Sequence, residues 1–121
     1  MGKRGRPKTA KNVIISPWLS AKADCREGRF CQIGNTLLLS EEFQTLKDST
    51  KYLYICMAME AAGRSEFVFP LSAAKKYGIA RATLRRAIEE LIDKQFIDMT
   101  SSGKTTREAN FYVFSSKWKP P

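Results

Sequence analysis

Residues 71–94 read LSAAKKYGIARATLRRAIEELIDK, and this stretch decides the fold. Its first part predicts a short helix, about Leu71 to Tyr77, that stops at Gly78. Its second part predicts a longer helix from about Arg81 to Lys94, with only a tight turn between the two. Two helices joined by a short turn that contains glycine are typical of a helix-turn-helix.

The longer helix has one apolar face and one charged face. Its apolar residues recur at helical spacing and predict a single buried stripe: Leu84, Ala87, Ile88, Leu91 and Ile92. The other face has its bases, Arg81, Arg85 and Arg86, in the N-terminal half, and its acids, Glu89, Glu90 and Asp93, in the C-terminal half. This order opposes the helix dipole, at a cost of about 0.3–1 kcal/mol for each charge. A recognition helix that enters the major groove by its N-terminal half has such an order, whereas a solvated helix with random charges is the alternative.

The flanking segments predict the elements of a winged helix. Upstream, the pattern predicts a strand over 36–39, a helix over 41–46 capped by Ser40, a helix over about 50–62 capped by Asp48 or Ser49 and ended by Gly63, and a strand over 67–69. The helix over 50–62 is apolar nearly all round, which places it at the centre of the fold. Downstream, strands over 96–99 and 110–114 and the polar loop 101–107 predict a hairpin. The expected fold class is therefore α+β: a mostly helical winged helix-turn-helix with a small antiparallel hairpin as its wing.

The N-terminal segment 1–12, MGKRGRPKTAKN, has five basic side chains, no acid and almost no apolar residue. It cannot bury itself, so we expect a disordered basic arm. Its core Arg4-Gly5-Arg6-Pro7 resembles an AT-hook. Two extended arginines fit the narrow, negative minor groove of A·T-rich DNA, and the glycine lets the backbone approach the groove floor. A generic basic tail held by phosphates is the alternative.

Charge and composition limit the classes of function. The 121 residues include 21 lysines and arginines, 12 acids and no histidine, for a net charge of +9. Such an excess attracts DNA, RNA or an anionic membrane surface, so the distribution of charge must decide among them. Apolar residues make up 43%, enough for one modest core. No apolar run is long enough for a membrane span or a signal peptide, which predicts a cytoplasmic protein.

We expect the longer helix to make the main contacts to double-stranded DNA. Arg85 and Arg86 are long enough to reach guanine edges or phosphates, and Arg81 could do either. Ala82 is small enough for contact with a thymine methyl group, and Thr83 could donate to a phosphate.

Two further elements provide candidate DNA contacts. Lys75 and Lys76, on the shorter helix, suit the DNA backbone. In the polar loop the candidates are Lys104, Thr105, Thr106 and Arg107. A solvated hairpin loop without DNA contacts is the alternative for this segment.

The sequence predicts neither catalysis nor a metal or cofactor. The absence of histidine removes the usual general base, and the acids lie at spacings typical of solvated helix faces. Three cysteines without a CxxC pair argue against a zinc site. Cys56 is expected to pack in the core, whereas Cys25 and Cys31 form either a disulfide or, as expected in a reducing compartment, free thiols.

The patterns divide the chain into four segments: the arm 1–12, an uncertain extended or connecting segment 13–29, the winged helix-turn-helix domain 30–116 and a C-terminal tail 117–121. Either segment 13–29 or the tail around Trp118 could pair two protomers in a homodimer. A monomer whose footprint the arm extends is the alternative.

Residues 30–43, FCQIGNTLLLSEEF, with residues 51–55, KYLYI, resemble the N-terminal winged-helix domain of plasmid replication initiators of the RepA type. Residues 69–70, 73–79 and 87–91 are similar to helix-turn-helix cores of small proteins on bacterial mobile elements. The resemblance spans residues 30–116 and implies a winged-helix fold, DNA as the partner and a mobile-element setting. Replication initiation is not carried over, because initiators continue into further domains. Gln95 stands where many such domains have glycine, so we expect a slightly different turn there.

Three functions remain open from the sequence. The first is a DNA-binding transcriptional regulator that uses the recognition helix, the wing and the basic arm, with A·T-rich duplex as the favoured partner. The second is an accessory or initiator-like protein of DNA replication or recombination. The third is a winged helix that contacts protein or RNA, against which the placement of the arginines argues.

Overall fold

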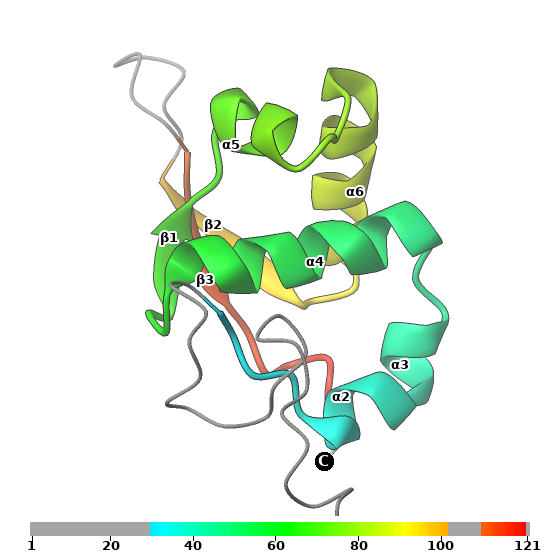
Figure 1. Ribbon diagram of the computed structural model, residues 1–121. Coiled ribbons are helices and arrows are strands. Elements are labelled where there is room, and N and C mark those ends of the chain that lie inside the picture. Colours follow the sequence, from blue (N-terminus) through cyan, green and yellow to red (C-terminus); the bar gives the residue numbers. More distant parts are fainter. Residues whose placement is uncertain (1–29, 102–109, 121) are drawn as a thin grey trace, which may run out of the picture.

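The computed structural model describes residues 30–101 and 110–120 (Figure 1). Within these ranges it has five helices and three strands: α2 (Asn35–Leu39), α3 (Glu41–Gln44), α4 (Asp48–Ala61), β1 (Glu66–Val68), α5 (Leu71–Lys76), α6 (Arg81–Asp93), β2 (Ile97–Ser101) and β3 (Phe111–Phe114). From α4 onward the order is helix, strand, helix, helix, strand, strand. The fold is therefore the predicted α+β winged helix-turn-helix.

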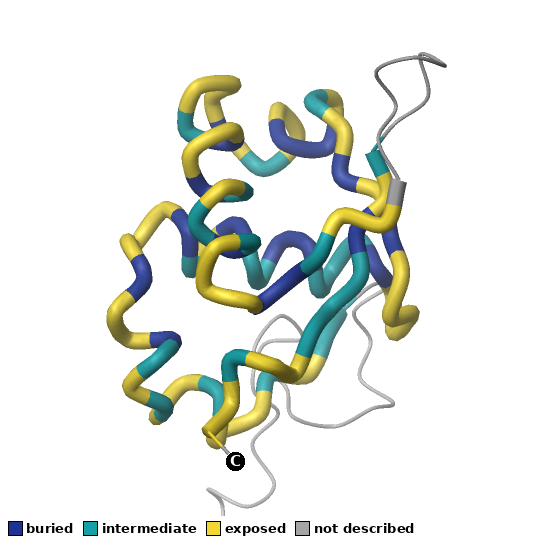
Figure 2. Tube along the Cα trace, turned by 180° about the vertical axis from the view of Figure 1, so that it is seen from behind, coloured by how far each residue is buried: buried dark blue, intermediate teal, exposed yellow. Residues whose placement is uncertain are grey.

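Helix α4 lies across the middle of the molecule, with α5 and α6 on one side and α2 and α3 on the other (Figure 1). It contacts both α6 and β1, and it buries Leu53, Cys56 and Met57. Figure 2 shows buried and exposed stretches alternating along the helices, as expected for helices with one face on a core. The central position and the buried thiol predicted from the sequence are thereby confirmed.

The three strands form an antiparallel sheet in the order β1-β3-β2. The predicted pairing of β2 with β3 is present, with Ile97 opposite Phe114. The sequence did not reveal that β3 also pairs with β1, where Phe67 lies opposite Tyr112. Phe67, Tyr112 and Ile97 are buried, so the inner face of the sheet contributes to the same core as the helices.

Helix α5 ends at the glycine that the sequence marked. Gly78 has φ of +78°, and its N–H donates to the Lys75 carbonyl at 3.1 Å. The next N–H, that of Ile79, donates to the Ala74 carbonyl at 2.8 Å. These two bonds form a Schellman cap, a helix end that requires a left-handed residue and favours glycine. The cap turns the chain sharply and so positions the start of α6 beside α5.

Helix α6 ends in the same motif but with glutamine at the left-handed position. Gln95 has φ of +68°, and its N–H donates to the Ile92 carbonyl at 3.1 Å. The Phe96 N–H donates to the Leu91 carbonyl at 2.8 Å, and both of these side chains are fully buried. The turn expected to differ at Gln95 therefore has the usual geometry, which this residue adopts at a steric cost.

We expect Gln95→Gly to raise the free energy of unfolding. Glycine removes the Cβ strain at positive φ, and its greater freedom in the unfolded chain offsets part of the gain, leaving about 0.5–1 kcal/mol. The side chain of Gln95 is exposed, so its removal costs little packing. Urea denaturation of the two proteins measures the difference. Gln95→Ala keeps the strain and should show no gain; equal stabilisation by alanine and glycine would contradict the explanation.

The strand predicted over residues 36–39 is wrong, because these residues form helix α2. A run of three leucines fits a helix as well as a strand, and none of the described strands pairs with it. Side chains complete the end of α2 instead. The Ser40 hydroxyl donates to the Leu37 carbonyl at 2.7 Å, and the Gln44 amide donates to the Leu38 carbonyl at 3.1 Å. As predicted, Ser40 also caps α3, accepting from the Phe43 N–H.

Helix α4 is capped by a residue from α6, so the predicted cap by Asp48 or Ser49 is wrong. Lys47 occupies the cap position without a side-chain hydrogen bond. The Glu90 carboxylate instead accepts from the Thr50 hydroxyl at 2.6 Å and from the Lys47 N–H at 3.5 Å. A carboxylate at this end also stabilises the positive end of the helix dipole. Thr50 is only 1% exposed, so this bond satisfies a buried hydroxyl.

The C-terminal segment packs on the domain through one side chain, that of Trp118. The Trp118 indole stacks on Phe96, with 4.9 Å between ring centroids and an interplanar angle of 10°. Phe96 also packs edge-on against Tyr54 and Phe43. Trp118 is partly buried by these contacts within its own chain, and the pairing of two protomers through this segment stays a prediction.

Candidate nucleic-acid interface

Helix α6 presents the predicted basic face to solvent. Arg81, Ala82, Arg85 and Arg86 are exposed, and Thr83 is half-buried. On the opposite side Leu84, Ala87 and Leu91 are buried, and Ile88 and Ile92 pack against the core. Because residues four apart share a helix face, Arg81 and Arg85 lie one turn apart, as do Ala82 and Arg86. The structure thus brings these predicted site residues together in the first two turns of the helix.

The three arginines of α6 make no ion pair with any residue that the structure describes. Arg85 and Glu89 lie four residues apart, but a base N-terminal to an acid is the weaker order for a helical ion pair. Each guanidinium therefore keeps its five N–H donors available for an external acceptor. Planar guanidinium groups bind phosphates and the O6 and N7 atoms of guanine in a bidentate manner.

The two lysines of α5 differ in their surroundings. The Lys76 ammonium forms an ion pair with Glu60 of α4 at 2.8 Å and lies 5.4 Å from the centroid of the Tyr77 ring. Lys75 is exposed and has no ion pair within the described ranges. The structure therefore leaves Lys75 available for a DNA phosphate, whereas Lys76 must give up or share its contact with Glu60.

A polar cluster joins α5 to α4 and keeps the helix-turn-helix in place. The Tyr77 hydroxyl donates to the Glu60 carboxylate at 2.5 Å, and the Tyr52 hydroxyl donates to the Tyr77 carbonyl at 2.9 Å. Interaction with the Cys56 side chain, together with burial, raises the pKa of Tyr52. Sequence reasoning missed this cluster, because its members lie 17 and 25 residues apart in the chain.

The acids in the second half of α6 do not share one role. The sequence assigned Glu89, Glu90 and Asp93 together to an outward face, and this is wrong for Glu90, which caps α4. Glu89 and Asp93 are exposed and line a shallow hollow between α6 and the start of α4. The sequence offered one signal for this contact: Thr50 is a polar residue near the start of an apolar helix, and a buried hydroxyl needs a hydrogen-bond partner.

Most of the net positive charge belongs to segments outside the described residues. Residues 1–29 include eight lysines and arginines and two acids, against 21 and 12 in the whole chain. The candidates Arg4, Gly5 and Arg6 lie in this segment. The wing candidates Lys104, Thr105, Thr106 and Arg107 also lie outside the described residues. The structure describes only β2 and β3, the strands before and after this loop. The DNA contacts of these seven residues stay predictions.

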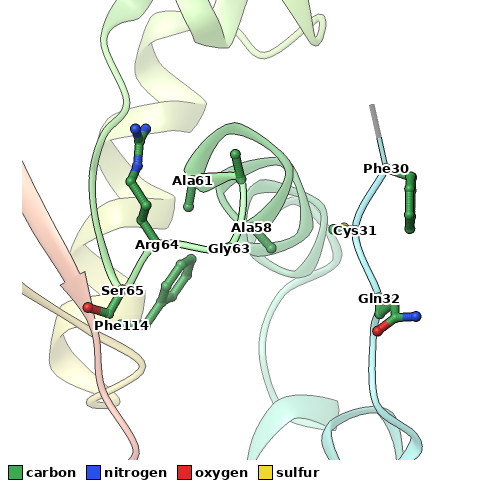
Figure 3. A pocket seen from close by; sticks show the side chains of 10 residues that line it. Phe30, Cys31, Gln32, Ala58, Ala61, Gly63, Arg64, Ser65 and Phe114 are labelled. Atoms are coloured by element: carbon green, nitrogen blue, oxygen red, sulfur yellow. The ribbon is translucent and has the colours of Figure 1, made fainter. Parts of the chain in front are cut away.

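A second hollow, of about 670 Å³, lies between residues 30–32 and the C-terminal end of α4 (Figure 3). Ala58, Ala61 and Gly63 form much of its wall, to which Arg64 adds a charged side chain. Cys31, also in the wall, forms no disulfide with a described residue, and burial raises the pKa of its thiol. Cys25 lies outside the described residues, so the alternative of a disulfide to it is not described. Among the described residues that line this hollow, no acid and base or nucleophile and base form a catalytic pair.

The chain matches no family model, no curated protein and no solved structure. The resemblance to plasmid replication initiators therefore stays an expectation from the sequence pattern. Within residues 30–101 and 110–120, no group of three or more acids and cysteines is placed to hold a metal ion. None of the helices in these ranges combines the length and the apolar character that crossing a membrane requires.

Proposed function

We propose that the protein binds double-stranded DNA as a non-enzymatic, cytoplasmic transcriptional regulator, with α6 inserted into the major groove. The observation that carries this proposal is the exposed basic face on the first two turns of α6. Arg81, Arg85 and Arg86 oppose the helix dipole, make no ion pair within the described residues and belong to the second helix of a helix-turn-helix. None of the contacts described for the fold accounts for that arrangement.

The supporting elements divide the contacts among different parts of the DNA. Lys75, exposed on α5, would contact the DNA backbone beside the groove. The wing follows directly from β2 and precedes β3, and its Lys104 and Arg107 would extend the contacts along the duplex. The arm, with two arginines around Gly5, would occupy an A·T-rich minor groove next to the site.

Fluorescence anisotropy with short labelled duplexes tests the proposal. The full chain is titrated into A·T-rich and G·C-rich duplexes of equal length at several salt concentrations. We expect salt-dependent binding to both, with a preference for the A·T-rich duplex. Absence of binding to any duplex at low salt would refute the DNA function, and it would direct the search to protein or RNA partners.

Deleting residues 1–12 should lower the affinity and reduce its dependence on salt. The segment holds five basic side chains and no acid, so the deletion removes groups that bind phosphates and leaves every described part of the fold in place. The slope of log affinity against log salt should become shallower by about 0.9 for each phosphate that the arm neutralises in the full chain. An unchanged slope would show that the arm does not contact the DNA. A chain in which only Arg4 and Arg6 become alanine separates insertion in the minor groove from general attraction.

A further inference from the structure

Glu89 is an acid that contributes no described contact to the fold. Its side chain is exposed, and no hydrogen bond or ion pair involves it in the described ranges. It lies in the second half of α6, where a negative charge opposes the helix dipole. Asp93 follows four residues later, so two like charges share one face. All of these local effects are neutral or unfavourable for stability, in contrast to those of Glu90, whose carboxylate caps α4.

Glu89 shares its face with the arginines assigned to DNA. It lies four residues after Arg85 and three after Arg86, about 6 Å further along the helix axis than Arg85. Arg86, Glu89 and Asp93 line one hollow together, so these side chains belong to a continuous surface. If α6 lies along the major groove, residues 82, 85, 86 and 89, which recur at i, i+3, i+4 and i+7, face the base edges together.

An ionised carboxylate can only accept hydrogen bonds, which restricts what it tolerates in the major groove. Only the amino groups of cytosine and adenine donate there. The adenine amino group lies beside the N7 lone pair, which repels the second carboxylate oxygen, whereas cytosine presents its amino group without a neighbouring acceptor on the same base. Guanine and thymine present acceptors at the corresponding places, so the carboxylate would be left unpaired.

From this chemistry we propose that Glu89 is a specificity-determining residue that selects cytosine at one position of the DNA site. This inference rests on the proposed function and adds to it one named base. Arg85 and Arg86 supply affinity for guanine edges and phosphates. Glu89, one turn of α6 after Arg85, disfavours duplexes that lack cytosine at the position it faces. Its contribution is mainly discrimination, because the same charge is repelled by phosphates elsewhere on the duplex.

The test is selection of preferred duplexes from a randomised pool by the full chain and by Glu89→Gln. Glutamine keeps the size of the side chain but pairs in a bidentate manner with N6 and N7 of adenine. We expect the preference at a single position to move from cytosine to adenine, with a change of about tenfold in relative affinity. Preferences at the other positions should stay as they are.

Asp93→Asn is the matched control. It removes the same charge from the same face one turn later, so both variants should bind all duplexes slightly more tightly at low salt. Only Glu89→Gln should change a base preference. If the two variants differ from the parent by the same uniform gain, the specificity role is refuted while DNA binding stands. If the parent chain enriches no duplex at all, the proposed function falls and this inference falls with it.

Discussion

Replacing Arg85 and Arg86 together with alanine should weaken binding to the selected duplex by about a thousandfold. A bidentate contact to a base is worth about 1–3 kcal/mol, so removing two such contacts of middle strength gives an effect of this order. Both side chains are exposed and form no ion pair in the described part of the chain, and alanine is a strong helix former, so the stability of the domain should not fall. Anisotropy titrations measure the affinity, and urea denaturation checks the fold.

The control for this double variant removes the same charge from the other end of the molecule. Lys117 and Lys119 are exposed near the C-terminus, which lies beside α2 and away from α5 and α6 (Figure 1). Alanine at both positions should lower the affinity only slightly and by the same factor for every duplex. If the lysine and arginine variants lose affinity equally, α6 is not the recognition helix, and the binding is a property of net charge alone.

The second large effect is expected from Phe96→Ala, which should lower the free energy of unfolding by about 3–5 kcal/mol. The ring is fully buried, stacks on Trp118 and packs edge-on against Tyr54 and Phe43. Its removal leaves a cavity at the junction of α3, α4 and the C-terminal segment, and the surrounding rings cannot fill it without moving. Such a decrease is a large part of the roughly 5–15 kcal/mol typical of a whole domain.

Trp118 supplies a local readout for the same variant. In a Trp18→Phe background it is the only tryptophan of the chain. We expect its fluorescence to shift to the red in Phe96→Ala under native conditions, because the indole loses its stacking partner. Phe96→Leu keeps much of the buried volume and should retain most of the stability. Equal stability of the alanine and parent proteins would show that the C-terminal segment is not packed on the core.

Helices with long, regular patterns could be predicted from the sequence. The thirteen residues of α6 repeat their apolar positions over more than three turns, which determines both the helix and its buried face. Gly78 marks the end of α5 because few other residues tolerate a positive φ. The same reasoning failed for α2, whose five residues are too few to separate a helical period from a strand.

Contacts between distant residues could not be predicted, and they include the most informative details of the site. The exposed arginines of α6 were identified because periodicity shows which residues face outward. Periodicity does not show that Glu90 reaches Thr50, forty residues away, or that Glu60 holds Lys76. These pairs depend on how the helices are packed. A charged residue in such a pair supports the fold, whereas a charged residue without a partner is available to a ligand. Charge alone does not distinguish the two kinds of residue.

The cap that α6 provides to α4 sets a limit on how this protein can change its target. Residues 82, 85, 86 and 89 face outward without described partners, so they can be exchanged as a set to suit a different DNA sequence. Glu90, directly beside them, cannot follow, because Thr50 and the start of α4 depend on it. Residues available to contact DNA and a residue that the fold requires therefore lie next to each other on one helix. A recognition helix transplanted from another protein would need a side chain that accepts hydrogen bonds at this position, whatever bases it reads.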